Sequence, residues 1–437
     1  MKRSVIICAS VILTLCLNSC IEISNKFTAL PPGPWRGVLK LPVNASPASI
    51  ETIETEENQI VRRYSELPFN FSVEYITVDS FQIVITNGPE EVTLSSIKYG
   101  IDRATAKDTL IIDFPAYDTY IKAIYEENFI EGAWHVNYKD NYSIPFIAYQ
   151  GQVNRFKVPP IKPSIDINGA WEVTFDYDKG DDAYPAIGIF KQEENGKLTG
   201  TFETETGDYR FLEGIVYGEK FNLSVFDGSH AFLFQAKQTG ENEIVGTFNS
   251  GKHYKSNWIA KRSTKTASLT SPYELSKPTQ TEAINFTFKN TAGQEVSLTD
   301  KKFEGKPKLI NIMGTWCPNC RDEVNFLMQN YKRINDAGIE IISLSFERYK
   351  DEKRSLEAIN RYKKHMKIPW TMLHGGYFDK AEATEKLPFI DRVISYPTLL
   401  FVDADNKIQK IHTGFNGPAT KDYPAFEKEF FNLINSL

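Results

Sequence analysis

The sequence predicts an antiparallel all-β N-terminal region made of two barrel- or sandwich-like repeats, followed by an α/β domain. The chain has 437 residues, which is enough for two to three domains. Up to residue 262, short runs rich in Tyr, Phe, Val, Ile and Thr are broken by Gly, Asn and Asp, as in β-structure. From residue 284 onward, strand patterns alternate with helix patterns. The chain is therefore expected to be multidomain.

The N-terminus predicts export and a lipid anchor. A short basic start precedes an apolar run from Val5 to Leu17 that is too short to span a bilayer. Leu17-Asn18-Ser19-Cys20 resembles a bacterial lipobox, so residues 1–19 are expected to be a signal peptide and Cys20 the lipidated first residue. An ordinary secretory signal that contains a cysteine is the alternative. Because Ile21 rather than an aspartate follows, the resemblance to sorted lipoproteins favours the outer membrane of the cell envelope over the inner one, with the protein facing the periplasm or the exterior.

Charge and cysteine usage narrow the function classes. The net charge of −6 does not favour nucleic acid or an anionic membrane surface as a partner. Three of the five cysteines lie at or before the predicted lipid site, so Cys317 and Cys320 remain as the thiol pair of an exported domain. Such a pair is expected to be used for chemistry, with a structural disulfide as the alternative. Zinc would need two further ligands, and none lies at suitable spacing, so no metal and no cofactor is predicted.

The β-rich region contains a degenerate repeat, with copies predicted at residues 20–157 and 164–262. Gly33-Pro34-Trp35 opens the first copy and Gly169-Ala170-Trp171 the second, and each copy closes with a Gly-x-aromatic strand, as is common in barrels and sandwiches. A Pro-rich connector lies between them. Two small barrels and two halves of one barrel both remain open. The region is expected to bind a ligand or present a substrate, or else to be a rigid spacer or dimerisation surface.

A segment rich in Ser, Thr, Lys and Pro, residues 263–283, predicts a flexible linker into a domain at 284–437. The elements predicted in that domain are, in order, a hairpin (286–288 and 295–298), a buried strand (308–313), a helix (317 to about 332), a strand (340–346), a helix (352–366), a second hairpin (398–402 and 407–412) and a closing helix (423–437).

Trp316-Cys317-Pro318-Asn319-Cys320 carries the chemistry. Two cysteines separated by two residues, at a helix start directly after an apolar strand, form a thioredoxin-type redox pair. At the helix N-terminus, free backbone N–H groups and the helix dipole stabilise a thiolate, so Cys317 is predicted to be the attacking nucleophile. Cys320, one turn further in, is expected to be shielded and to resolve the mixed disulfide by attacking Cys317.

On these residues, the C-terminal domain resembles the TlpA/ResA branch of membrane-associated thioredoxin-like proteins. The resemblance rests on the entry hairpin, the run from Met313 to Glu323, the run from Ser395 to Asp403, and an insertion at 348–392. It does not reach the N-terminal 265 residues. It implies a thiol–disulfide oxidoreductase that acts on protein disulfides. It favours a reductant, kept reduced by a membrane electron donor and acting on cytochrome-maturation apoproteins or misoxidised proteins.

The resemblance also implies roles for three further residues. Glu323 matches an acidic residue implicated in proton handling at the buried cysteine, and burial would raise its pKa so that it could accept the Cys320 proton. The alternative is an acid that stabilises the helix dipole. Pro397 matches a cis proline that exposes backbone to an extended substrate, against a trans proline that bounds a strand. Trp316 is expected to cover the pair, or to be purely structural. Tyr396 is larger than the residue usual at its position, so substrate preference is not carried over.

Three other functions fit the sequence less well. A thiol peroxidase is one, because TlpA-like domains are relatives of peroxiredoxins; the Pro-x-x-x-Thr-x-x-Cys arrangement of those enzymes is absent here. A copper chaperone that adds a distant histidine such as His412 is disfavoured by the Cys-x-x-Cys spacing. A non-enzymatic β-barrel ligand-binding lipoprotein is weakened because both cysteines are intact. The other histidines show no i, i+4 pairing and are expected at the surface: His135, His230, His253, His365 and His374.

Overall fold

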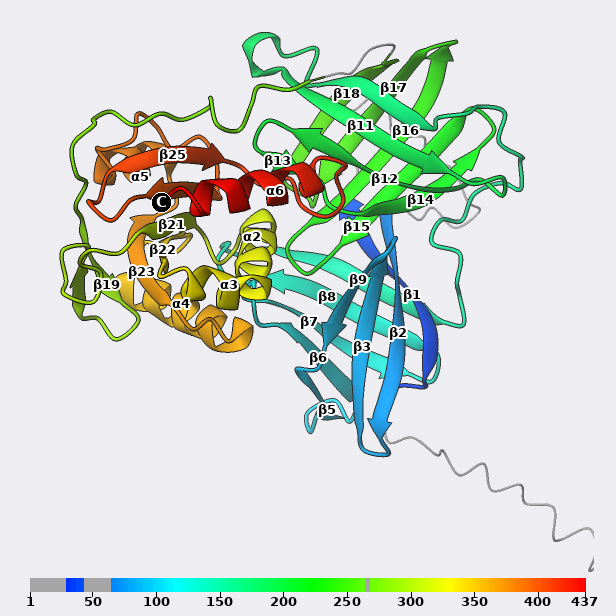
Figure 1. The fold of residues 1–437 in the computed structure, drawn as a ribbon. Coiled ribbons are helices and arrows are strands. Elements are labelled where there is room, and N and C mark those ends of the chain that lie inside the picture. Colours follow the sequence, from blue (N-terminus) through cyan, green and yellow to red (C-terminus); the bar gives the residue numbers. More distant parts are fainter. Residues whose placement is uncertain (1–28, 43–63, 264–267) are drawn as a thin grey trace, which may run out of the picture.

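The computed structural model describes residues 29–42, 64–263 and 268–437, and the chain forms three sheets (Figure 1). The first β-module comprises strands β1–β9, the second β-module comprises β10–β18, and a thioredoxin-like domain follows from β19 onward. The predicted fold class, an all-β N-terminal region before a thioredoxin fold, is confirmed. Within the described ranges, no helix has the length and apolar character needed to cross a membrane.

The first β-module is an antiparallel sheet in the order β4-β3-β2-β1-β9-β8-β7-β6-β5. β4 pairs with β3 at one edge of the sheet, and β5 pairs with β6 at the other edge. Only residues 95 and 96 separate these two edge strands in the sequence. The strands are β1 (Gly33–Pro42), β2 (Tyr64–Thr77), β3 (Ser80–Asn87), β4 (Glu90–Leu94), β5 (Ile97–Ile101), β6 (Asp108–Phe114), β7 (Thr119–Glu126), β8 (Phe129–Val136) and β9 (Ser143–Gln150).

The second β-module is a closed antiparallel barrel, because β11 pairs with both β10 and β12 while the remaining strands continue around to β12. The strands are β10 (Gly169–Phe175), β11 (Tyr184–Gln192), β12 (Lys197–Thr204), β13 (Gly207–Asp208), β14 (Leu212–Tyr217), β15 (Lys220–Phe226), β16 (Ala231–Gly240), β17 (Glu243–Ser250) and β18 (Tyr254–Arg262). The two sequence copies thus form two separate sheets rather than two halves of one barrel.

The Gly-x-Trp repeat has the same local structure in both modules. Trp35 Nε1 donates to the carbonyl of Pro31 at 3.2 Å, and Trp171 Nε1 donates to the carbonyl of Ile167 at 2.9 Å, four residues back in each case. Both indoles are buried, so each needs a partner for its N–H. The preceding glycines have φ of 103° and 95°, a region that favours glycine.

The thioredoxin-like domain has a seven-stranded sheet in the order β20-β19-β23-β22-β21-β24-β25. Strands β21, β22 and β23 are parallel, and β24 runs antiparallel to β21. Central parallel strands are buried on both faces, which explains why every residue of β21 and all but the first residue of β22 are buried. The strands are β19 (Thr287–Asn290), β20 (Glu295–Ser297), β21 (Lys308–Met313), β22 (Glu340–Glu347), β23 (Thr371–Tyr377), β24 (Thr398–Val402) and β25 (Ile408–Thr413).

The predicted helices occur in the predicted order, but one of them is divided, and the sequence did not predict the helix Lys380–Lys386 or the strand β23 before it. The helix expected from Cys317 to about residue 332 is two helices, because α2 ends at Gln329, Asn330 caps both helices, and a short α3 begins at Tyr331. Asn330 Nδ2 donates to the Phe326 carbonyl at 2.9 Å, a side-chain bond to the backbone at this break. The helices are α2 (Pro318–Gln329), α3 (Tyr331–Asp336), α4 (Glu352–Met366), α5 (Lys380–Lys386) and α6 (Tyr423–Ile434).

The described part of the predicted linker, residues 268–283, lies against the thioredoxin-like domain. Leu275 and Ser276 are buried, and the Pro272 carbonyl accepts from Thr413 N at 2.9 Å. Pro278 also forms a β-bridge with Ile390. The composition suggested a flexible connector, but these contacts hold the segment in place along the domain.

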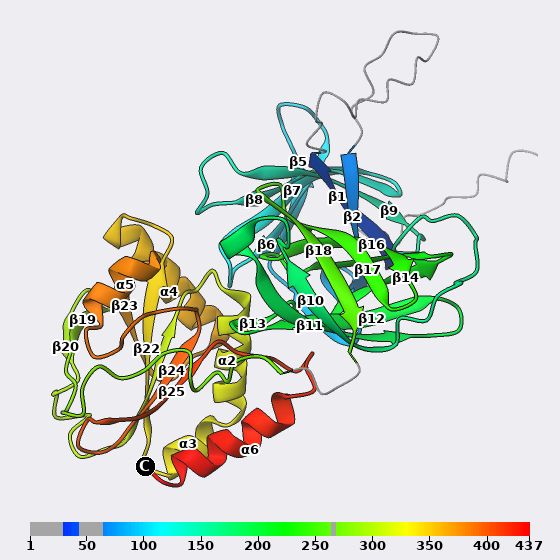
Figure 2. The same ribbon diagram turned by 90° about the horizontal axis from the view of Figure 1, so that it is seen from above.

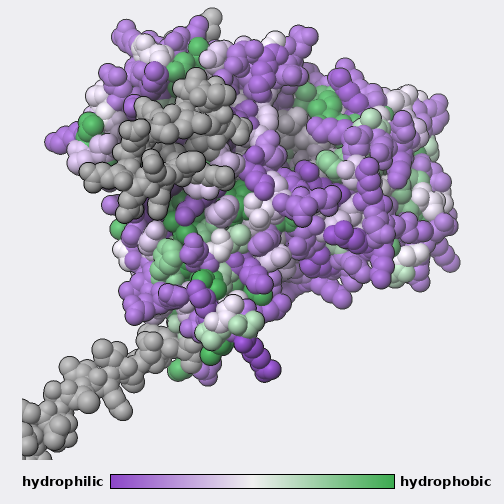
Figure 3. All heavy atoms as spheres, turned by 180° about the vertical axis from the view of Figure 1, so that it is seen from behind, coloured by the Kyte–Doolittle hydropathy of each residue, from purple (hydrophilic) through white to green (hydrophobic). Residues whose placement is uncertain are grey.

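Buried apolar side chains form two clusters, and one of these clusters extends over more than one module. One cluster runs from the first β-module into the thioredoxin-like domain and includes Phe226 and Leu233 of the second. The other fills the barrel of the second β-module. Seen from above, α2 lies at the side of its domain that faces the β-modules (Figure 2). Hydrophilic residues cover most of the face seen from behind (Figure 3).

Candidate active site

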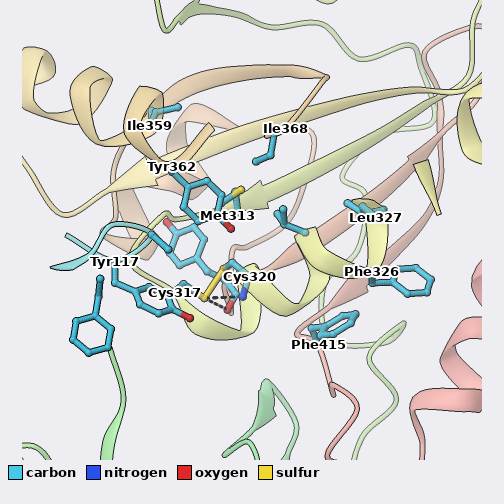
Figure 4. Close-up of a cluster of buried hydrophobic side chains, with 14 of the residues drawn as sticks. Tyr117, Met313, Cys317, Cys320, Phe326, Leu327, Ile359, Tyr362, Ile368 and Phe415 are labelled. Carbon is cyan, nitrogen blue, oxygen red and sulfur yellow. Dashed lines mark hydrogen bonds between the residues drawn. A yellow bond between two sulfur atoms is a disulfide. The ribbon is translucent and has the colours of Figure 1, made fainter. Parts of the chain in front are cut away.

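Cys317 and Cys320 form a disulfide at the start of α2 (Figure 4). Cys317 is the N-cap residue, with extended backbone (φ −98°, ψ 117°), and its Sγ accepts from Cys320 N at 3.2 Å. Pro318 begins the helix, a position that needs no N–H. Cys317 is 6% exposed and Cys320 is fully buried. The asymmetry of exposure agrees with the roles predicted from the sequence, with Cys317 outermost and Cys320 shielded.

The structure places Pro397 beside the disulfide. The Tyr396–Pro397 peptide is cis, as the sequence predicts, and the Tyr396 carbonyl oxygen lies 3.4 Å from Cys317 Sγ. The Pro397 carbonyl accepts from Gly414 N at 2.8 Å, which ties this loop to the turn after β25. The loop before β24 therefore places the Tyr396 carbonyl in contact with Cys317.

Trp316 packs on the redox loop as a half-buried side chain. Its Nε1 donates to the Phe346 carbonyl at 3.0 Å, and its ring meets Phe378 and Tyr396 edge to face at 5.5 and 5.8 Å. The Arg348 guanidinium lies 4.1 Å from the ring centroid, a cation–π distance. These contacts fix the ring next to the pair, and the prediction that Trp316 covers it stays a prediction.

Glu323 is fully buried one helical turn after Cys320. Burial raises the pKa of its carboxyl to about 8, although the amide of Asn311, which donates to its Oε2, acts in the opposite direction. Asn311 Oδ1 accepts from Ser343 Oγ at 3.3 Å, and that hydroxyl accepts from Trp370 Nε1 at 2.9 Å. A buried acid of this kind is not a solvent-exposed acid at the helix start, so proton handling is the role that its environment supports.

Glu347, a second buried carboxyl, was not singled out from the sequence. It lies at the end of β22 and accepts from Thr315 N at 3.1 Å, Thr315 Oγ1 at 2.7 Å and Ser345 Oγ at 2.6 Å. Burial raises the pKa of this carboxyl as well. It holds the backbone two residues before Cys317. The sequence signal for Glu347 was a charged residue at the end of an apolar strand. The signal for Asn311 was a polar residue within another such strand.

The residues that follow the pair bind the β-modules, which sequence patterns could not indicate. Arg321 Nη1 donates to Tyr117 OH of the first module at 3.2 Å, and both Tyr117 and Tyr362 lie near the start of α2 in Figure 4. Asp322 pairs with Arg210 of the second module. Arg210 is 4% exposed and also contacts Glu90 of the first module and Asp227 of the second.

Two candidate residues lie elsewhere. Cys20, the predicted lipidation site, is outside the described residues. His412 is buried between Tyr273 and Phe426, and burial lowers its pKa to about 4. Across the described ranges, no group of three or more His, Cys, Asp or Glu side chains is arranged to hold a metal ion.

Comparison with known proteins assigns the C-terminal part of the chain. Residues 279–411 match the AhpC/TSA family model, so the C-terminal domain is an AhpC/TSA-type thioredoxin-like domain. Among curated proteins, the chain is similar to the thiol-disulfide oxidoreductase ResA of Bacillus thuringiensis subsp. konkukian (strain 97-27), with 30% identity over 129 residues, 29% of this chain and 65% of the relative. ResA of Bacillus subtilis (strain 168) is 25% identical over 133 residues, 30% of this chain and 66% of the relative. The chain thus spans slightly less than two thirds of these relatives.

Solved structures are also similar to part of the chain. A thiol:disulfide interchange protein of the thioredoxin family from Chlorobium tepidum TLS is 20% identical, with 37% of this chain and 96% of that chain covered and a TM-score of 0.28. A thiol-disulfide oxidoreductase from Bacteroides fragilis NCTC 9343 is 18% identical, with 34% and 98% covered and a TM-score of 0.26.

Proposed function

We propose that this chain is a thiol–disulfide oxidoreductase held in the bacterial cell envelope by a lipid on Cys20, more consistent with the outer membrane than the inner one. It exchanges disulfides with exported proteins through Cys317 and Cys320, in the reducing direction, and a membrane electron donor regenerates it. The observation that carries the proposal is the Cys317 Sγ at the N-cap of α2, 3.2 Å from Cys320 N and 3.4 Å from the Tyr396 carbonyl beside cis-Pro397.

The proposed reaction has two exchange steps. The Cys317 thiolate attacks one sulfur of the partner disulfide, the partner's S–S bond breaks, and its other sulfur leaves as a thiolate that takes a proton. Cys320 then loses its proton and attacks Cys317 Sγ, which releases the second partner thiol and leaves the Cys317–Cys320 disulfide. Two electrons pass to the partner. The helix N-terminus stabilises the attacking thiolate in the first step.

Glu323 is proposed to take the proton from Cys320 in the second step. Its pKa of about 8 belongs to the form with the disulfide closed, so the carboxyl holds a proton at neutral pH after exchange. That is the state expected of a base that has just accepted the proton of Cys320, and of the acid that would return it when the donor reduces the pair.

Two measurements test the direction and the activity. The reduced full-length protein should reduce the disulfide of an unstructured peptide, Cys317→Ser should abolish this, and Cys320→Ser should accumulate a mixed disulfide at Cys317 on non-reducing gels. The midpoint potential is expected well below about −150 mV, towards the reducing end of the range of Cys-x-x-Cys proteins. A value above that would refute the reducing direction. Incorporation of labelled fatty acid, lost in Cys20→Ser, tests the anchor.

A thiol peroxidase is the second candidate, supported by the AhpC/TSA match over residues 279–411. A peroxidase would oxidise Cys317 to a sulfenic acid with loss of water from the peroxide, and Cys320 would condense with it to the disulfide. Consumption of hydrogen peroxide by the reduced protein distinguishes the two functions. Turnover with peroxide at a rate that exceeds exchange with protein disulfides would favour the peroxidase.

A further inference from the structure

The second β-module covers the face of the redox site where a partner would dock. Residues 204–208, the hairpin between β12 and β13, lie along the loops beside Cys317. Ser395 Oγ, two residues before cis-Pro397, donates to the Thr206 carbonyl at 3.1 Å. Asn319 Nδ2, between the two cysteines, donates to the Asp208 carbonyl at 3.3 Å, and Gly417 N donates to the Asp208 carboxylate at 2.5 Å.

This approach is close at the backbone level. A Cβ on Gly414, whose φ is +80°, would lie 2.7 Å from the backbone carbon of Thr206, and a Cβ on Gly207 would collide with Asn319. The backbone contact requires glycine at position 414, and the φ of +141° favours glycine at position 207, where the added Cβ would displace the Asn319 side chain. The hairpin is therefore seated directly against the turn after β25 and the start of α2.

Two neighbouring turns of the β-modules also contact the redox loop or the arginine that stacks on it. Ser229 Oγ, after β15, donates to the Trp316 carbonyl at 3.1 Å. Arg348, which stacks on Trp316, also lies 5.5 Å from the ring of Tyr138 in the first β-module. Together with the pairs that bind Arg321 and Asp322, every residue from 316 to 322 other than the two cysteines and Pro318 contacts a β-module.

The first β-module fixes this arrangement at a distance from the cysteines. Asp118, in the turn after β6, accepts from Tyr349 OH and forms an ion pair with Arg361 at 3.2 Å. Arg361 Nε also donates to the Pro115 carbonyl at 3.0 Å. A continuous apolar cluster lies beneath these contacts and joins the first module to the thioredoxin-like domain. Separating the first module from the domain would expose this apolar surface to water at a large cost in free energy. The β-modules are therefore expected to stay over the redox site rather than to cover it transiently.

We propose that the 204–208 hairpin and the turn at Ser229 determine the substrate class of the redox site, restricting Cys317 to slender disulfides. These are disulfides of low-mass compounds or of flexible, unfolded chain segments, whereas a disulfide on the surface of a folded protein is sterically excluded. The inference rests on the proposed function, because it names the partners of the same cysteine. The β-rich half is then part of the substrate site.

The test measures access to Cys317 without requiring disulfide exchange. The full-length Cys320→Ser protein is reacted with N-ethylmaleimide, with a maleimide on an unstructured peptide, and with a maleimide on a short linker to a folded carrier protein. Modification of the Cys317 peptide is followed by mass spectrometry, and each rate is divided by the rate of free cysteine. The folded carrier should be slowed by at least about tenfold relative to N-ethylmaleimide, and the peptide by less than about threefold.

Two variants loosen the cover without altering the redox loop. Asp118→Asn removes the charge that binds Arg361, and Arg210→Gln removes the cation shared by the three modules. Either one should raise the relative rate of the folded carrier and leave that of N-ethylmaleimide unchanged. Asp181→Asn, in the exposed turn at 180–182, is the matched control. Arg210→Gln can fail to fold, in which case Asp118→Asn decides.

Equal relative rates for the carrier and N-ethylmaleimide in the parent protein would overturn the inference, and so would a carrier rate that neither loosened variant raises. Failure of the proposed function gives a different result. A Cys317 that shows the size selection, in a chain whose intact pair reduces neither glutathione disulfide nor a peptide disulfide, would refute the oxidoreductase and leave the steric cover intact.

Discussion

Asn311 donates its side-chain amide to the carboxylate of Glu323, and both side chains are completely buried behind the Cys317–Cys320 pair. One residue is on β21 and the other on α2, so the bond joins the central strand to the redox helix. Glu323 Oε1 has no hydrogen-bond partner among the described residues. A single neutral donor leaves burial as the dominant influence on the pKa of the carboxyl.

Glu323→Gln should change the pH dependence of disulfide exchange. In the parent protein, the rate at which the closed disulfide is reduced should vary across a pKa of about 8, because the carboxyl that returns a proton to Cys320 loses that proton there. The variant should lose that transition and fall by about 10²- to 10⁴-fold at neutral pH, the usual contribution of general acid–base catalysis. Stopped-flow rates between pH 5 and 10 provide the measurement. An unchanged profile would exclude proton transfer by Glu323.

The same carboxyl should make the oxidised protein less stable as the pH rises. Its folded pKa of about 8 exceeds its unfolded value of 4.5, so the folded state holds more protons between these values. The stabilisation is complete below pH 4.5 and is lost as the pH rises through 8, by at most about 5 kcal/mol. Asp208, whose pKa burial raises to about 6, acts in the same direction. Urea unfolding at several pH values should give a smaller slope for Glu323→Gln than for the parent.

Arg210→Met should destabilise the assembly of the three modules. The variant leaves the carboxylates of Glu90, Asp227 and Asp322 together without their shared cation, which typically costs about 3–5 kcal/mol. The free energy of unfolding in urea measures the loss. Arg103→Met, at an exposed turn position, should change it by less than about 0.5 kcal/mol. Adding Asp322→Asn should recover part of the loss; a purely additive double variant would contradict the coupling.

Trp35→Phe and Trp171→Phe should have matched costs. Each removes the indole hydrogen bond to the carbonyl four residues back, worth about 1 kcal/mol, and leaves that carbonyl without the indole donor. The loss of ring volume adds to both equally. Unfolding followed by tyrosine and tryptophan fluorescence would report each. Costs that differ by more than about 1.5 kcal/mol would show that the repeat is not structurally equivalent.

The local elements of the redox domain could be predicted from sequence because short-range signals define them. The apolar run of β21, the Cys-Pro-Asn-Cys helix start and the Ser-Tyr-Pro-Thr segment each lie within a few residues and lead directly to the buried Cys320 and the cis Pro397. The internal repeat was visible for the same reason, since Gly-x-Trp marks the first strand of each module.

The surroundings of the pair could not be predicted, since they depend on contacts between distant parts of the chain. Arg210 and Asp322 are separated by 112 residues, and Tyr117 and Arg321 by 204. Neither pair has a pattern that one sequence reveals. The prediction of a flexible linker is wrong for the same reason. Its polar composition does not indicate that Leu275 and Ser276 are buried against the domain.

The division of the buried apolar side chains has a consequence for how the protein unfolds. Because one cluster joins the first β-module to the thioredoxin-like domain, these two regions share a cooperative unit although the second module lies between them in the sequence. The barrel, with its own cluster, is the separate unit. Denaturation should therefore proceed in two transitions, and the residues of one transition should not be contiguous in the sequence. Hydrogen exchange should group residues 33–42 and 64–150 with 284–437.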